Sequence, residues 1–268
     1  MWNRPDVDFI ASQDLPWSSV PAGLFGADHG GGLRKTLSVD EEDGARTDLI
    51  AFTNRQRGVL RHSCDFFVLA GRGMVNDQPY APGTYLYAEA MTELDWVPGP
   101  GRTVLFFGPH GSPEFEPGQG SGKLTVLQES RDEWTSMSWR GDEPQPADVK
   151  IRWLRRDDTG IVFLVGMLPG YRAPMEEKHP VYEESFKIAG DLLLGRRGVV
   201  KPGGYFFRSP ETWHGPLYSR TGNLSLIRKN AHGSTDYRDP LPGCDLETLI
   251  PACYDSDPSL HPSLLGQA

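Results

Sequence analysis

Two histidines and two glutamates in the second half of the 268-residue chain have side chains that bind transition metals. Glu177, His179 and Glu183 follow one another closely, and His214 comes after a Pro-Gly-Gly turn further along. Imidazole nitrogen and carboxylate oxygen are ligands of divalent metals such as Fe, Mn, Zn and Ni. The four residues therefore predict a mononuclear metal site. The structural alternative is a pair of hydrogen-bonded core histidines beside a surface glutamate.

Alternation along a β-strand would bring three of these side chains together. Residues two positions apart project to the same face of a strand, so Glu177, His179 and Glu183 share a face if the strand is continuous. His214 would arrive from a neighbouring strand. Glu184 lies on the opposite face by the same rule, which favours its neighbour as the ligand. For Glu177 three roles stay open: fourth ligand, general base, or a carboxylate that faces solvent.

Cations and aromatic residues near these positions are candidates for binding a substrate. Lys187 shares the strand face of Glu183, and Arg208 lies in the strand that precedes the second histidine. Either could pair with a carboxylate or enolate of a substrate, or be an ordinary surface cation. Tyr205 and Phe207 could line the pocket, or fill the interior without a role in function.

The segments that must position these side chains are predicted to be short strands. Glycine and proline, at 31 and 23 residues, exceed their usual share of roughly an eighth and indicate many turns. The stretches between turns are rich in β-branched, Leu and aromatic residues, which favour strands. They are residues 47–52, 65–70, 103–107, 160–168, 185–189 and 224–228. Spacing of about ten residues is typical of a β-sandwich or barrel.

The chain also repeats itself at a long period. Phe67-Val-Leu-Ala-Gly71 is echoed by Phe186-Lys-Ile-Ala-Gly190, and Pro82-Gly-Thr-Tyr85 by Pro202-Gly-Gly-Tyr205. Two further pairs of segments match in the same order at nearly the same offset, which indicates a duplicated domain. We therefore expect an all-β fold with an N-terminal domain over residues 1–108 and a C-terminal domain over 148–232. A linker over 109–147, with an extra strand at 123–128 and a short helix at 129–139, and a tail over 233–268 complete the chain.

The first copy lacks the ligands of the second. At the offset of the repeat, the four candidate ligands correspond to Gly58, Leu60, Cys64 and Leu94. Three of these residues cannot bind a metal, so the N-terminal domain is predicted to be structural. The alternative is a soft-metal site formed by His62 and Cys64.

The motifs of the second copy resemble those of the cupin family. His179, three residues, Glu183, six residues and Gly190 fit the second half of the family's first motif. Glu177 stands where that motif has its first histidine, which is a departure. The segment from Gly204 to His214 is similar to the second motif, with Thr212 in place of a glycine and the histidine one residue early.

This resemblance implies two tandem cupin domains, each a double-stranded β-helix or jelly roll, with the metal inside the C-terminal barrel. In detail the chain is similar to bicupins related to the cupin half of the ChrR-type zinc-dependent anti-sigma factors. More distantly, it resembles small cupin dioxygenases that cleave carbon–carbon bonds of diketones and hydroxyacetophenones. The fold hosts many chemistries and does not by itself fix the function.

Charge and composition exclude some classes of partner. The net charge is −9 and no long run of Lys and Arg occurs, which argues against nucleic acid. No apolar run is long enough to cross a bilayer, and no leader for secretion is evident. The cysteines, Cys64, Cys244 and Cys253, are odd in number and lack metal-finger spacing. We therefore expect a cytoplasmic protein that acts on a small molecule, with a homodimer left open.

The function predicted first is a non-haem iron dioxygenase acting on a small enolisable or phenolic carbonyl compound, with Fe(II) as its one divalent metal. The second hypothesis is a redox-neutral lyase, isomerase or cyclase that uses Zn, Mn or Ni as a Lewis acid. The third is a ligand-binding or sensor protein without enzymatic activity.

Overall fold

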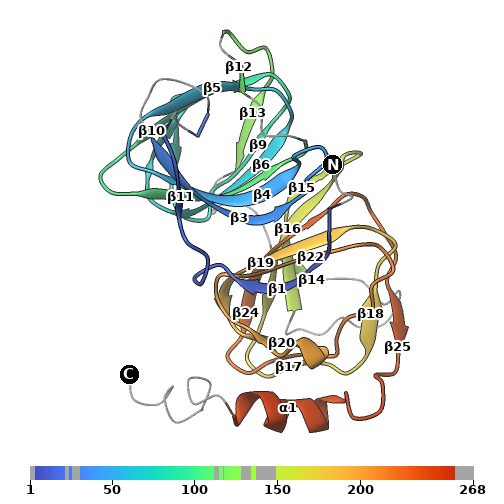
Figure 1. The fold of residues 1–268 in the computed structure, drawn as a ribbon. Coiled ribbons are helices and arrows are strands. Elements are labelled where there is room, and N and C mark those ends of the chain that lie inside the picture. Colours follow the sequence, from blue (N-terminus) through green and yellow to red (C-terminus); the bar gives the residue numbers. More distant parts are fainter. Residues whose placement is uncertain are drawn as a thin grey trace. The chain divides into compact units, whose positions relative to one another are not determined.

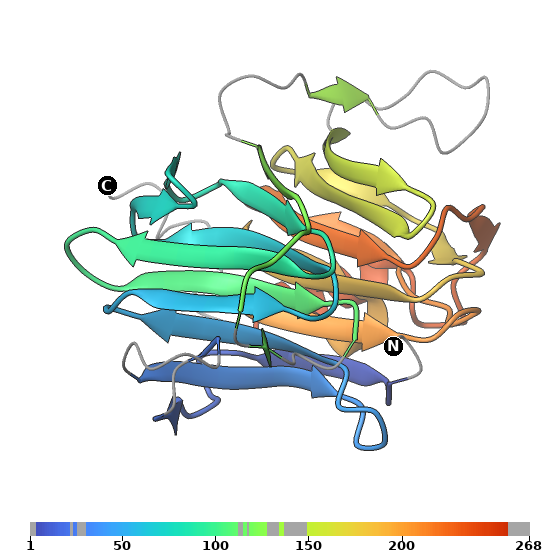
Figure 2. The same cartoon turned by 90° about the horizontal axis from the view of Figure 1, so that it is seen from above.

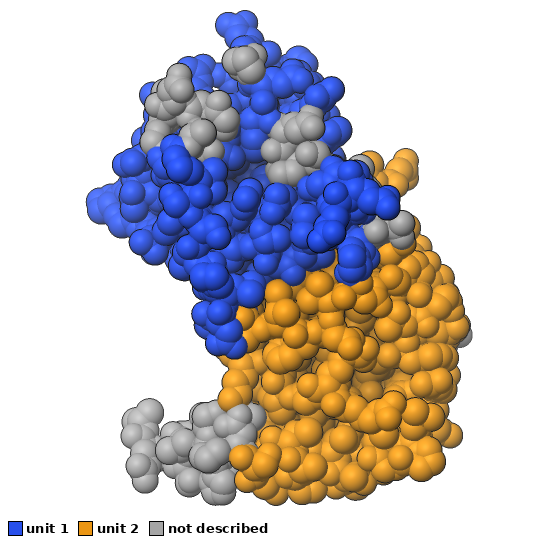
Figure 3. Space-filling model, in the orientation of Figure 1, with its two compact units in different colours: residues 1–5, 12–132 blue, residues 6–11, 133–268 orange. Residues whose placement is uncertain are grey.

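The computed structural model describes residues 4–21, 24–25, 31–111, 115–116, 118–127, 134–136 and 149–256. The chain forms two compact units, which Figure 3 shows in different colours. Unit 1 comprises Met1–Pro5 and Ser12–Asp132, and unit 2 comprises Asp6–Ala11 and Glu133–Ala268. Within the described residues, the regular structure of both units is almost all β-strand (Figure 1).

Unit 1 contains a seven-stranded sheet in the order β13-β9-β6-β11-β4-β3-β2, whose strands lie side by side in Figure 2, and a five-stranded sheet in the order β12-β5-β10-β7-β8. All pairs are antiparallel. The strands are β2 (Ser18–Val20), β3 (Gly32–Val39), β4 (Arg46–Phe52), β5 (Gln56–Leu60), β6 (Cys64–Ala70), β7 (Gly73–Val75), β8 (Gln78–Tyr80), β9 (Tyr85–Ala88), β10 (Thr92–Pro98), β11 (Thr103–Pro109), β12 (Phe115–Glu116) and β13 (Leu124–Leu127).

Unit 2 has a seven-stranded sheet in the order β1-β22-β19-β24-β16-β15-β14, a four-stranded sheet in the order β17-β23-β20-β21, and the pair β18-β25. The strands are β1 (Val7–Ala11), β14 (Thr135–Ser136), β15 (Val149–Asp157), β16 (Gly160–Met167), β17 (Tyr171–Ala173), β18 (Glu176–Lys178), β19 (Glu183–Gly190), β20 (Leu192–Leu194), β21 (Val199–Val200), β22 (Gly204–Arg208), β23 (Leu217–Ser219), β24 (Asn223–Lys229) and β25 (Asp236–Arg238). Unit 2 also contains a 3-10 helix, η1 (Gly195–Arg197), and the helix α1 (Leu246–Tyr254).

The two units repeat one another down to single hydrogen bonds. The N–H of Met91 donates to the carbonyl oxygen of Leu60 in unit 1, and the N–H of Glu211 donates to that of His179 in unit 2, both at 2.7 Å. Met91 and Glu211 also share a positive φ, 61° and 65°, which non-glycine residues seldom adopt. The offset of about 120 residues, predicted from short sequence echoes, therefore matches equivalent backbone positions.

The interior of unit 1 is filled with apolar side chains. Phe25 is 1% exposed and packs its ring against Phe52, Phe66, Phe107 and Phe115. Its backbone passes so close to Gly58 that a Cβ there would lie 2.0 Å from the Phe25 carbonyl oxygen. Gly58 is the position equivalent to Glu177, so a glycine at this point lets the Phe25 segment enter the barrel.

The unit boundaries differ from the predicted domains because segments expected to connect or wrap add strands to the sheets. Strands β12 and β13, from the expected linker 109–147, pair with β5 and β9 of unit 1. Strand β1, expected in the N-terminal domain 1–108, pairs with β22 of unit 2. In the expected tail 233–268, β25 pairs with β18 next to the candidate ligands.

The short helix expected over residues 129–139 falls largely outside the described residues, and Thr135–Ser136 within it is the strand β14. The strand expected over 123–128 corresponds to β13. Among the residues that the structure describes, no helix has the length and apolar character needed to span a membrane.

Candidate metal centre

The four candidate ligands come together at one end of the unit 2 barrel. Glu177 lies on β18 and pairs with His214 through an isolated antiparallel bridge. His179 follows β18 directly, and Glu183 begins β19. The continuous strand expected from Glu177 to Glu183 is not formed, because residues 179–182 leave the extended pairing at Pro180, which has no N–H to donate. The side chains converge all the same.

The donor atoms of three of these residues form a tight group. One ligand atom each from Glu177, His179 and His214 lies within 4.8 Å of the other two, and His214 Nε2 is 3.3 Å from Glu177 Oε1. The carboxylate of Glu183 borders the group, with Oε2 3.7 Å from His214 Nε2 and 3.8 Å from His179 Nε2. Metal–ligand bonds of about 2.0–2.2 Å place neighbouring donor atoms about 3.0–3.5 Å apart, so this spacing fits one ion.

The far nitrogens of both imidazoles are held by hydrogen bonds. His214 Nδ1 lies 3.1 Å from the carbonyl oxygen of Thr212, and His179 Nδ1 lies 3.1 Å from Thr235 Oγ1. A carbonyl oxygen can only accept, so Nδ1 of His214 carries the hydrogen and, in the neutral ring, Nε2 presents its lone pair. Metal-bound histidines are oriented by hydrogen bonds of this kind.

This arrangement leaves a group of acceptors facing one another. The Nε2 lone pair of His214 points toward carboxylate oxygens of Glu177 and Glu183. Lys229 offsets the charge of Glu183, but Glu177 and the Nε2 lone pair of His214 still need a positive charge between them, either a proton on the imidazole or a metal ion. Burial lowers the pKa of His179, an effect that Glu183 opposes, and this favours the neutral imidazole that a metal needs.

Glu183 lies between two cations at paired strand positions. Its Cα partners are Arg208 on β22 and Lys229 on β24, and Lys229 Nζ is 3.1 Å from Glu183 Oε1. Burial raises the pKa of the Glu183 carboxyl. The charge of Lys229, followed by those of the two histidines, lowers the pKa by more than burial raises it, so the pKa is far below its ordinary value. Glu183 is therefore ionised.

Arg208 is an unusual residue for a protein interior. Its side chain is 2% exposed and lies over the Phe206 ring. Within the part of the chain that the structure describes, none of its three guanidinium nitrogens has a hydrogen-bond partner. Burial lowers its pKa to about 10, opposed by the charge of Glu183. Arg208 borders a narrow crevice together with His179, Glu183 and His214. A buried cation without hydrogen bonds is costly, which makes Arg208 a strong candidate for binding an anion.

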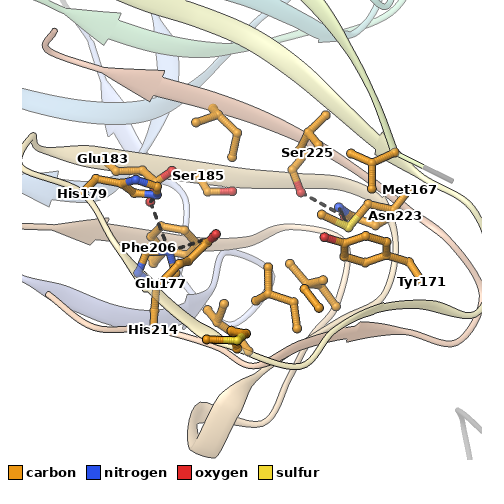
Figure 4. A pocket seen from close by; sticks show the side chains of 18 of the residues that line it. Met167, Tyr171, Glu177, His179, Glu183, Ser185, Phe206, His214, Asn223 and Ser225 are labelled. Atoms are coloured by element: carbon orange, nitrogen blue, oxygen red, sulfur yellow. Dashed lines mark hydrogen bonds and ion pairs between the residues drawn. The ribbon is translucent and has the colours of Figure 1, made fainter. Parts of the chain in front are cut away.

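A cavity of about 140 Å³ opens from the ligand group into the barrel (Figure 4). An apolar cavity of roughly this size holds a molecule as large as benzene. The walls are mainly apolar side chains of both sheets, with polar groups at the two ends. The lining residues include Val149, Phe163, Val165, Met167, Tyr171, Glu177, His179, Glu183, Ser185, Leu192, Leu194, Phe206, His214, Leu217, Asn223, Ser225, Ile227, Lys229 and Tyr237.

None of the four predicted substrate-binding residues lines this cavity. The Tyr205 hydroxyl donates to Glu184 Oε2 at 2.6 Å, and Phe207 stacks on Tyr182. On β22 it is Phe206 that lines the cavity, because alternate residues face opposite sides of a strand. Lys187 faces the barrel interior without bordering the cavity. Its Nζ donates to Oδ1 of Asn223, and Asn223 lines the cavity. The reading of Lys187 and Arg208 as surface cations is wrong, since both are 2% exposed.

Several residues that line the cavity were not among the predicted site residues. Four of them alternate along β24, namely Asn223, Ser225, Ile227 and Lys229. The alternation of these four residues along the strand can be read from the sequence. Had the pairing of β24 with β19 been predicted as well, these side chains would have been placed beside Glu183. Thr235 and Tyr237, which reach the site from the segment expected to be a tail, gave no such signal.

Unit 1 has no counterpart of this centre among its described residues. Leu60, Cys64 and Leu94 are fully buried in one apolar cluster, and the Cys64 thiol donates to the carbonyl oxygen of Asp65. Among the residues described, the group of three potential ligands close enough to hold a metal is the one in unit 2, and neither His62 nor Cys64 belongs to such a group.

The fold is all-β, with two tandem domains of the cupin type, and solved structures support this assignment. A candidate dioxygenase from Nostoc punctiforme superposes with a TM-score of 0.75 at 17% identity, covering 87% of each chain. HEPD from Streptomyces albus, solved with 2-hydroxyethylphosphonate and Fe(II) bound, superposes with a TM-score of 0.59 at 7% identity. The match covers 83% of this chain and 75% of that one. A salicylate 1,2-dioxygenase from Pseudaminobacter salicylatoxidans superposes with a TM-score of 0.52 at 12% identity, and the match covers 72% of this chain and 74% of that one.

No protein-family model matches the sequence, and no curated protein is significantly similar to it. At these levels of identity the structural likeness shows the cupin fold, and the narrower resemblance to ChrR-type proteins stays a prediction.

Proposed function

We propose that this protein is a mononuclear metal-dependent cupin enzyme, and that its metal is Fe(II) and its reaction the dioxygenation of a small enolisable or phenolic carbonyl compound. The observation that carries the proposal is the convergence of Glu177, His179 and His214 on one point at the end of an apolar cavity. Two imidazoles and a carboxylate are the ligand types of non-haem iron oxygenases.

The residues that would hold the metal are His179 and His214 through Nε2 and Glu177 and Glu183 through carboxylate oxygens. Bound Fe(II) would supply redox chemistry with dioxygen. Lys229 keeps Glu183 ionised and oriented through its 3.1 Å ion pair, and Thr212 and Thr235 fix the two imidazole rings. These contacts pre-organise the donor atoms, so that little rearrangement is needed on binding.

Two residues are placed to act on the substrate itself. Glu177 is 24% exposed at the side-chain level, toward the cavity. Burial raises the pKa of the Glu177 carboxyl, but a protonated His214 beside it lowers that pKa more. The carboxylate is then ionised and, where it does not bind the metal, can accept a proton from an enolisable substrate. Arg208, whose guanidinium has no hydrogen-bond partner among the described residues, would bind an anionic oxygen on the Glu183 side, outside the cavity.

The structural neighbours support an oxygenase without establishing one for this chain. They include a salicylate dioxygenase and an Fe(II)-bound enzyme, while the identity to this chain is low. The second carboxylate, Glu177, favours one further candidate: a redox-neutral lyase, isomerase or cyclase with Zn, Mn or Ni, in which Glu177 moves the proton.

Oxygen dependence separates the two candidates. Iron-loaded protein is incubated with a panel of 1,3-diketones and phenolic ketones, with and without dioxygen, and substrate loss and oxygen uptake are followed. Turnover with stoichiometric oxygen uptake supports the dioxygenase. Equal turnover under nitrogen, best with Zn or Mn, contradicts it and supports the redox-neutral enzyme.

A further inference from the structure

The end of the cavity away from the candidate ligands is polar as well. Asn223 and Ser225 on β24 lie there with Met167 and Tyr171, while Glu177, His179 and His214 lie at the other end (Figure 4). The Ser225 hydroxyl donates to Asn223 Oδ1 at 3.0 Å, and the Lys187 ammonium donates to the same oxygen. The amide oxygen of Asn223 is thus fully engaged by donors.

The amide nitrogen of Asn223 is left with a poor partner. Among the residues described, Nδ2 contacts Met167 Sδ at 3.4 Å, and a thioether sulfur is a weak acceptor. An amide N–H in a largely apolar cavity gains from a stronger acceptor. A ligand oxygen that replaced the sulfur would provide one.

The fold does not require these polar groups. Lys187 lies opposite Ser225 across β19 and β24, and the same pair of positions in unit 1 holds Val68 and Leu105. Both of those residues are fully buried in the apolar cluster of unit 1. Lys187 is 2% exposed, and burial lowers its pKa to about 7, opposed by the charge of Asp191. Keeping a lysine here is costly, which points to a ligand that benefits from it.

We propose that Asn223, supported by Ser225 and Lys187, forms a subsite for a carbonyl or carboxylate oxygen at the distal end of the substrate. This inference rests on the proposed function, in which the opposite end of the substrate faces the metal. The substrate class is therefore a compact molecule of about one ring, with metal-binding oxygens at one end and an acceptor oxygen at the other. Asn223 donates to that oxygen through Nδ2, and Lys187 adds favourable charge behind the amide.

Two catechols that differ at one group test the subsite. The affinities of 3,4-dihydroxybenzoate and 4-methylcatechol for zinc-loaded protein are measured by calorimetry. The wild type is expected to bind the carboxylate at least tenfold more tightly, and the double variant Lys187→Met/Asn223→Leu to bind both within about twofold. The double change is used because Asn223→Leu alone would strand the buried ammonium. Tyr205→Phe, outside the cavity, serves as the control and keeps the wild-type ratio.

The outcomes separate this inference from the proposed function. Binding of both catechols without the tenfold preference, or a preference that survives the double substitution, overturns the subsite and leaves the metal centre standing. Failure of the protein to retain zinc, and equally iron, manganese or nickel, overturns the metal centre. In that case benzoate binding to the metal-free protein still decides the subsite: wild type should bind at least fivefold more tightly than the double variant, and equal affinity refutes it.

Discussion

The backbones of Glu177 and His214 exchange two hydrogen bonds, from the Glu177 N–H to the His214 carbonyl at 2.7 Å and in the reverse direction at 2.9 Å. Gly58 and Leu94 face one another in the same way in the β5–β10 ladder of unit 1. The same backbone pairing therefore holds two candidate metal ligands in unit 2, and a glycine and a leucine in unit 1. The candidate metal centre and the filled core differ in their side chains.

The filled core of unit 1 should be sensitive to any side chain at Gly58. The Gly58→Ala variant is expected to lose about 1–3 kcal/mol or more of unfolding free energy, since its Cβ would clash with the Phe25 backbone. The matched control is Gly166→Ala in β16, where the Cβ would lie 3.3 Å from the movable Trp134 ring. Urea titration measures both. If both variants lost the same small amount of unfolding free energy, the Phe25 backbone would not lie against residue 58 in solution.

Leu94, the unit 1 counterpart of His214, should matter for stability alone. It is fully buried in the apolar cluster, so Leu94→Ala is expected to cost about 2–5 kcal/mol. Metal content per folded chain, measured by elemental analysis, should stay at the wild-type level. Loss of metal from a variant that remains folded would mean that unit 1 also takes part in metal binding.

Lys187 should make stability depend on pH in a definite direction. Its folded pKa is lowered to about 7 from 10.5, so between these values the unfolded state binds more protons and the wild type gains stability as pH rises. Relative to wild type, Lys187→Met should be most stabilising at or below pH 7. That advantage should shrink by up to about 1.4 kcal/mol per pH unit toward pH 10. Denaturant titrations at pH 7, 8.5 and 9.5 check this; a constant difference contradicts the buried ammonium.

The role of Glu177 can be divided between ligand and base. If Glu177 is a ligand, the Glu177→Gln variant should bind the metal at least about tenfold more weakly. The Glu177→His variant, which introduces another metal-binding side chain, should retain the metal. Competition with a chromophoric chelator measures the affinities. Unchanged affinity in Glu177→Gln, together with lost turnover, would assign Glu177 as the base and remove it from the ligand set.

The sequence predicted the fold and the candidate ligands, because both leave short-range signals. The spacing of His179, Glu183 and Gly190 survives in one chain segment, and Gly190 has a positive φ of 75° with the Gly222 carbonyl oxygen 1.9 Å from where a Cβ would lie. Strand parity also placed Glu184 away from the site, where it accepts from Tyr205 and pairs with Arg228.

What the sequence could not show depends on contacts between distant segments. The approach of Phe25 to Gly58 joins residues that no periodicity connects. Thr235 reaches His179 because β25 pairs with β18, and nothing in the local sequence signals that pairing. Tyr205 and Phe207 were assigned to the pocket by residue type alone, and the face of β22 that borders the cavity carries Phe206 instead.

Metal content tests the central claim most directly. Protein purified without oxygen is analysed for its elements beside His214→Ala, with circular dichroism to confirm that the variant is folded. We expect about one iron per chain in the wild type and none in His214→Ala. Full metal content in the variant, or none in the wild type after reconstitution with Fe, Mn, Zn and Ni, would contradict the metal centre.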